Sequence, residues 1–167
     1  MLFIALRRTT TLLLFASIAA CSSSKKDDPA PPTAGMSWTA DGTSQTTTTL
    51  QSQKFQSSVS VAGTIPASSN PTYLSLEFPN AVGTYTFGPA VAASATYVTN
   101  NGPNGMSAGY FAGATGSGTV AGAGTIVVTA LTALTATNVQ GTFTFTGINA
   151  ATGSVKSISN GTFNVGL

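Results

Sequence analysis

The sequence contains no histidine, a single cysteine and very few charged side chains, which make up 6% of its 167 residues. Without histidine, the chain lacks the side chain that most often acts as a general base near neutral pH and most often binds metal ions. A single cysteine cannot form a disulfide within the chain. These absences exclude histidine-dependent catalysis, histidine-ligated metal sites and a disulfide-stabilised fold.

The remaining charges balance one another. From Cys21 onward, the chain contains four lysines and four acidic side chains, so their formal charges cancel. Proteins that bind nucleic acid or anionic membrane surfaces do so through clustered lysine and arginine. Nucleic acid is therefore not an expected partner. The charged residues that remain from Met36 onward are Asp41, Lys54, Glu77 and Lys156.

A short apolar segment precedes the cysteine. It follows a pair of arginines, and its centre, residues 12–16, is too short to cross a bilayer as a permanent helix, which takes about 20 residues. Residues 18–21 read Ile-Ala-Ala-Cys and resemble a lipobox. We therefore expect a lipoprotein signal peptide at residues 1–20 and lipidation of Cys21. An ordinary buried cysteine is the alternative, but such a residue does not normally follow a signal peptide.

A polar, proline-rich stretch at residues 21–35 follows and is expected to be a flexible tether. Within it, Lys26, Asp27 and Asp28 resemble the lysine-plus-acidic export signal of Bacteroidetes surface lipoproteins. This resemblance implies an outer-membrane protein that faces the cell exterior. The alternative is that these three residues belong to a solvated linker.

Residues 36–167 are typical of one all-β domain. Asp41-Gly42 is the strongest kind of two-residue hairpin signal. Residues 73–78 alternate polar and apolar side chains, which predicts a strand with one buried face. The domain shows no helical period, and its short strand-like segments are separated by Gly, Asn and Pro. This pattern predicts a single antiparallel β-sandwich or a partly open β-barrel.

Two other segments give specific expectations. Residues 54–61 alternate like a strand and place Phe55 in the core. Asn160-Gly161 predicts a turn before a last strand at residues 162–167. The side chains on the expected inner faces form the predicted core. They are Trp38, Phe55, Val59, Val61, Leu74, Leu76, Phe78, Tyr85, Phe87, Ile126, Val128, Val139, Phe143, Phe145, Phe163 and Val165.

A Gly-Thr-aromatic motif recurs at residues 83–87, 141–145 and 161–165, with a weaker copy at residues 124–128. We expect its glycine to let the chain enter a strand from a turn. With these motifs the chain resembles an uncharacterised family of Bacteroidetes lipoproteins, and the resemblance covers nearly all of the domain. It implies a β fold and a lipid anchor. It implies no catalytic residues, because the family has no assigned activity.

The domain offers few residues for catalysis. Asp41 and Glu77 are its only carboxylates, and a pair held about 5–10 Å apart can hydrolyse glycosides. However, the hairpin turn explains Asp41, and an outward strand position explains Glu77. A serine–lysine pair needs a desolvated lysine, whereas Lys54 and Lys156 lie in polar contexts. A calcium site at Asp41 would need more carboxylates. We therefore expect no enzyme activity, no metal and no cofactor.

Binding is the class of function that the residues favour. Exposed aromatic rings bind the apolar faces of sugars, although such rings more often fill a core. The candidate rings are Trp38, Tyr73, Tyr97 and Tyr110. Tyr73 shares its expected outward face with Ser75 and Glu77. Tyr73 and Glu77 are therefore the expected ligand-binding residues, with a glycan as the ligand.

The expected function is a non-enzymatic binding module. Its expected partners are a membrane, through the lipid on Cys21, and a glycan or a surface protein. The alternative is a structural protein, because threonine-rich strands with few lysines lack the usual protection of sheet edges. Such an edge can accept a strand from a partner.

Overall fold

The computed structural model describes residues 33–67, 71–88, 93–99, 107–114, 120–131 and 138–167. The chain divides into two units, Met1–Pro31 and Pro32–Leu167, and the fold of the second is described below. The predicted lipidation and export residues lie outside the described residues. They are Cys21, Lys26, Asp27 and Asp28. Within the described ranges, no helix is long and apolar enough to cross a membrane.

The expected all-β antiparallel fold is confirmed, because each regular element in the described part of the chain is a strand and the strands pair antiparallel. The strands are β1 (Gly35–Ala40), β2 (Thr43–Thr47), β3 (Leu50–Lys54), β4 (Ser58–Ile65), β5 (Thr72–Pro79), β6 (Gly83–Phe87), β7 (Ser94–Thr99), β8 (Ala108–Ala114), β9 (Val120–Ala121), β10 (Ala123–Leu131), β11 (Asn138–Ile148) and β12 (Val155–Gly166).

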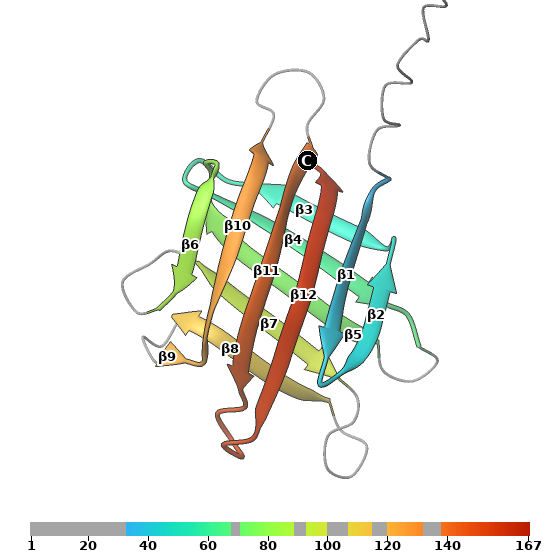
Figure 1. Cartoon of the computed structure of the whole chain (residues 1–167), viewed down its shortest axis with the longest axis vertical. Helices are drawn as coiled ribbons and strands as arrows, with labels where there is room; N and C mark the ends of the chain where they lie inside the picture. The colour runs from blue at the N-terminus through green and yellow to red at the C-terminus, as the bar shows by residue number, and fades with distance from the viewer. Residues whose placement is uncertain (1–32, 68–70, 89–92, 100–106, 115–119, 132–137) are drawn as a thin grey trace, which may run out of the picture. The chain divides into compact units, whose positions relative to one another are not determined.

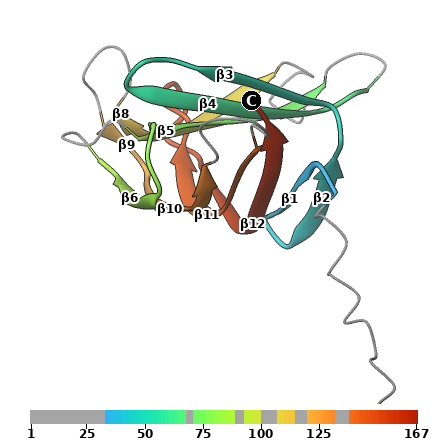
Figure 2. The same ribbon diagram turned by 90° about the horizontal axis from the view of Figure 1, so that it is seen from above.

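The strands of the domain form two facing layers (Figures 1 and 2). The front layer has the order β6-β10-β11-β12-β1-β2, and the back layer has the order β3-β4-β5-β7-β8-β9. The residue pair Ile148 and Phe111 joins β11 to β8, so the two layers belong to one sheet.

On the opposite side of the domain, β2 passes directly into β3, and two hydrogen bonds tie this connection to β4. The Thr47 hydroxyl donates to the Thr64 carbonyl at 2.6 Å, and the Thr64 amide donates to the Thr49 carbonyl at 2.9 Å. The sheet therefore curls into a nearly closed barrel, the second of the two architectures that the sequence predicted.

The core lies between the layers. Its predicted members are buried except for Phe55 and Tyr85. Phe55 is 45% exposed, so its placement in the core was wrong. Strand β3 ends at Lys54 and β4 begins at Ser58, and Phe55 lies in the short connection, where its amide donates to the Ser58 carbonyl at 2.8 Å. Tyr85 is half-buried at the rim, and its hydroxyl donates to the Ala81 carbonyl.

The two turn predictions have opposite outcomes. Asp41 and Gly42 connect β1 to β2 with φ values of 44° and 84°, so the predicted two-residue hairpin is confirmed. The predicted turn at Asn160-Gly161 is wrong, because β12 continues through it. Asn160 has a φ of 50° at a bulge, where the pairing register with β11 shifts.

The glycines of the Gly-Thr-aromatic motif make room for aromatic rings. In the register of β11 and β12, Gly141 lies opposite Phe163 and Phe143 lies opposite Gly161. A Cβ added at either glycine would lie 2.5 Å from the ring of the opposite phenylalanine. Both glycines are buried within strands. The expectation that they lead the chain out of a turn is therefore wrong for these two copies.

We expect Gly161→Ala to destabilise the protein by about 1–3 kcal/mol, the usual effect of overpacking a core. The new methyl group would overlap the ring of Phe143, which the buried strands hold in place. The free energy of unfolding in urea measures the effect.

Gly88→Ala is the matched control, because a Cβ at Gly88 would meet no atom within 4 Å and its backbone φ is ordinary. We expect that variant to be neutral or slightly stabilised. Equal unfolding free energies for the two variants would contradict the packing role of Gly161.

Candidate functional site

The outer face of the front layer carries two cross-strand rows of hydroxyl side chains, which we call the hydroxyl face. Residues that pair across neighbouring strands belong to one row, except that the bulge in β12 takes Thr144 and Ser159 out of direct register. The second row lies two residues along each strand, or three along β12. In strand order, the first row is Thr46, Ser37, Thr162, Thr142, Val127 and Thr84. The second row is Ser44, Thr39, Ser159, Thr144, Thr125 and Thr86. Of these twelve positions, Val127 alone lacks a hydroxyl, and none is charged.

The face exists because strands alternate their side chains. Each row member is exposed or half-exposed, and inward-facing residues such as Ile126, Phe143 and Phe163 lie beside it in the chain. Two row members are linked across strands, since the Ser37 and Thr162 hydroxyl oxygens lie 2.8 Å apart. The aromatic core and the hydroxyl face are therefore two sides of the same strands.

Two shallow hollows lie along this face. The larger has a volume of about 820 Å³ and includes Ser37, Thr46 and Gln140 in its lining. The second has a volume of about 580 Å³ and includes Thr125 and Ser159. Thr142 and Thr162 line both hollows, which are therefore adjacent. No charged residue lines either hollow.

The start of the described chain borders the larger hollow. The Asn164 side-chain amide of β12 donates to the Thr33 carbonyl at 3.2 Å. Thr33 and Ala34 are part of the lining. The residues that lead into β1 therefore contribute to the hollow.

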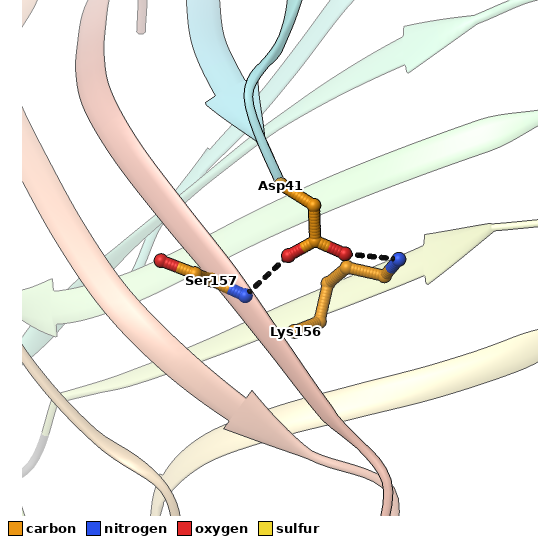
Figure 3. Close-up of polar contacts among 3 residues, drawn as sticks. All are labelled: Asp41, Lys156 and Ser157. Atoms are coloured by element: carbon orange, nitrogen blue, oxygen red, sulfur yellow. Dashed lines mark hydrogen bonds and ion pairs between the residues drawn. The ribbon is translucent and has the colours of Figure 1, made fainter.

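A separate polar cluster joins the β1–β2 turn to β12 (Figure 3). Lys156 Nζ lies 2.6 Å from Asp41 Oδ2, and the Ser157 amide donates to Asp41 Oδ1 at 2.9 Å. The Lys156 hydrogen bond, followed by that from Ser157, lowers the pKa of Asp41, and the hydrogen bond to Asp41 raises the pKa of Lys156. Lys156 also lies 5.6 Å from the centre of the Tyr110 ring. This geometry keeps Lys156 as an ammonium ion, whereas nucleophilic catalysis needs a neutral amine.

The predicted ligand-binding residues, Tyr73 and Glu77, lie on β5 and face outward from the back layer. Tyr73 is half-buried between Thr64 of β4 and Val98 of β7. Glu77 is exposed and accepts a hydrogen bond from the Ser58 hydroxyl at 3.1 Å. The two residues share a face, but four residues of extended strand separate them by about 13 Å.

The other candidate rings are not available at the surface. Trp38, Tyr97 and Tyr110 are core residues with exposures of 2%, 4% and 9%, so they cannot stack on a sugar, and the predicted core position of Trp38 is confirmed. Trp38 packs edge-on against Tyr97, with ring centres 6.4 Å apart. Burial raises the pKa of the Tyr97 hydroxyl, and the nearby Lys156 charge opposes that shift.

Sequence reasoning did not find the hydroxyl face, although part of its signal was visible. The motif copies at residues 83–87 and 141–145 carry threonines on the face opposite their aromatic residues. The pattern did not show that these strands and β12 lie in one layer. Among the described residues, no group of three or more His, Cys, Asp or Glu is placed to hold a metal ion.

The domain is thus a small antiparallel barrel that carries an uncharged hydroxyl face. The chain matches the family Domain of unknown function (DUF6252) over residues 41–165, which is most of its length, and it belongs to that family. No curated protein and no solved structure matches the chain.

We expect Asp41→Asn to reduce stability near neutral pH and to have little effect in acid strong enough to protonate Asp41 in the folded protein. The folded protein lowers the pKa of Asp41, so its stabilising contribution is present above the unfolded pKa of about 3.9 and is lost as the pH falls through the folded pKa. Because the ion pair is partly exposed, the expected loss is below about 1 kcal/mol.

Urea unfolding of wild type and variant over a pH series measures this difference. Asparagine is the chosen replacement because it tolerates the positive φ of residue 41, so the variant changes the charge without straining the backbone. Lys156→Met, alone and combined with Asp41→Asn, completes a double-mutant cycle. A stability difference that stays constant over the whole pH range would contradict the assignment.

Proposed function

We propose that this protein is a non-enzymatic binding module of the cell exterior, held at the outer membrane by a lipid on Cys21, and that it binds an uncharged ligand through the hydroxyl face. The observation that carries this proposal is a six-stranded face without a charged side chain and with two adjoining hollows. Soluble proteins usually distribute charges of both signs over their surfaces. An uncharged ligand rich in hydroxyl groups is the natural complement of such a face.

The sequence supports the location. Residues 18–21 resemble a lipobox, and Lys26, Asp27 and Asp28 resemble a surface-export signal. The proline-rich stretch that follows suits a spacer between membrane and domain. The proposal requires no cofactor and no nucleic acid partner.

For the anchor, we expect labelled palmitate to be incorporated into wild-type protein and not into Cys21→Ser. A labelled Cys21→Ser variant would show that another residue carries the lipid.

For the orientation, we expect surface protease to digest wild type on intact cells. Exchanging Asp27 and Asp28 for asparagine should protect the protein by leaving it inside the cell envelope, and unchanged digestion would contradict the export signal.

For binding, we expect the Cys21→Ser chain to be retained on uncharged polysaccharides and Thr142→Lys to lose retention. The lysine would place an unpaired charge at a position that lines both hollows. Tyr73→Ala and Glu77→Gln are matched controls on the back layer and should bind like the parent chain. Loss of retention in these two variants alone would move the site to Tyr73 and Glu77.

Assembly through a sheet edge is the second candidate, and the position of β2 supports it. Strand β2 is the last strand of the front layer, and its five residues, Thr-Ser-Gln-Thr-Thr, contain no charge and no proline. Such an edge can accept an antiparallel strand from another molecule. Concentration-dependent oligomers in analytical ultracentrifugation would support this role, and a strict monomer at high concentration would contradict it.

A further inference from the structure

We infer that the ligand of the hydroxyl face is a single chain of an uncharged polysaccharide, which lies across the six strands along the two hydroxyl rows. This inference rests on the proposed function and specifies its ligand. It follows from four properties of the face: its twist, its spacing, its lack of charge and its area.

The twist favours a flexible chain over a flat partner. Adjacent strands are rotated by about 20–25° on average, so six strands turn through roughly 100–125°. A flat crystalline surface could therefore contact only two or three strands at once. A flexible polymer can follow the whole face, and the two adjoining hollows lie along part of this path.

The spacing suits a sugar polymer. Neighbouring strands lie about 4.8 Å apart, and residues two apart along a strand are separated by about 6.7 Å. With each pyranose residue, a polysaccharide chain advances by a distance similar to the spacing between neighbouring strands. Each sugar of a chain lying across the strands would therefore meet one position from each row.

The side chains match the chemistry of an uncharged sugar. A threonine or serine hydroxyl both donates and accepts hydrogen bonds, as a sugar hydroxyl does. The threonine methyl groups and Val127 offer apolar contacts to the C–H groups of the ring. An acidic polysaccharide would instead call for arginine or lysine, and neither occurs in the two rows or in the linings of the hollows.

The area argues against a second folded protein as the occupant. Each outward position covers about 30 Å² of the sheet, so twelve positions cover about 400 Å². A standard protein complex buries about 800 Å² on each partner. A thin polymer needs less area, and many membrane-anchored copies can bind one polymer together.

The test uses the full chain carrying Cys21→Ser and a panel of immobilised glucan, mannan, xylan and galactan, with polygalacturonate as the acidic probe. We expect retention on at least one uncharged polymer and at least tenfold weaker retention on polygalacturonate. Titration with linear oligosaccharides of the retained polymer should show an affinity that rises with length up to about six residues, one for each strand.

Thr142→Val is the test variant, because it removes a hydroxyl and keeps the side-chain shape. We expect roughly a fivefold loss of affinity, and roughly twenty-fivefold for Thr142→Val with Thr125→Val. Thr96→Val, on the outer face of β7, is the matched control and should bind like the parent chain. Circular dichroism and urea unfolding identify any variant that fails to fold, and Thr84→Val then replaces it.

The outcomes separate this inference from the proposed function. Binding that depends on Thr142 but does not change with oligosaccharide length would overturn the inference and leave the proposed binding of an uncharged ligand standing. Equally strong retention on polygalacturonate would overturn both, because the proposed ligand is uncharged. Retention of none of the five polymers would overturn the inference. If the parent chain were retained and Thr142→Lys were retained equally well, the proposed function would fall as well.

Discussion

Two phenylalanines at the centre of the front layer each lie over a glycine of the neighbouring strand, and the rest of the domain depends on this packing. Phe143 of β11 and Phe163 of β12 have ring centres 6.4 Å apart, and Phe163 reaches Phe78 of the back layer at 5.7 Å. The contact joins the layers through side chains, whereas a single residue pair joins β11 to β8 through the backbone. Because strand side chains alternate, the inward rings also require Thr142 and Thr162 to face outward.

The charged side chains of the described residues lie off the hydroxyl face. The ion pair between Lys156 and Asp41 fixes the β1–β2 turn against the start of β12. That contact supports the register in which Ser37 of β1 pairs with Thr162 of β12. A surface ion pair of this kind contributes little stability by itself. Its larger effect is positional, because a slip of one residue would turn the hydroxyls of β1 inward.

The sequence predicted what depends on local pattern and missed what depends on neighbouring strands. The all-β fold, the Asp41-Gly42 hairpin and most of the core follow from alternation and turn chemistry. Phe55 was misplaced because alternation can continue through a short connection. Asn160-Gly161 suggested a turn because bulges and turns use the same left-handed residues. The packing of Gly141 and the hydroxyl rows could not be predicted, because both depend on which strands are neighbours. Gly141 lies opposite Phe163, 22 positions along the chain, and Ser37 lies opposite Thr162, 125 positions along it.

The two layers face in opposite directions, and this limits how the candidate residues can act together (Figure 2). Tyr73 and Glu77 face outward from the back layer, whereas the hydroxyl rows face outward from the front layer. A single ligand chain that lies along the hydroxyl rows therefore cannot also stack on Tyr73. If binding depended on both, two molecules of ligand or two separate sites would be required. In the proposed function, the recurring threonines of the front layer would therefore bind without an exposed aromatic ring, and the affinity would come from many weak hydrogen bonds along one polymer.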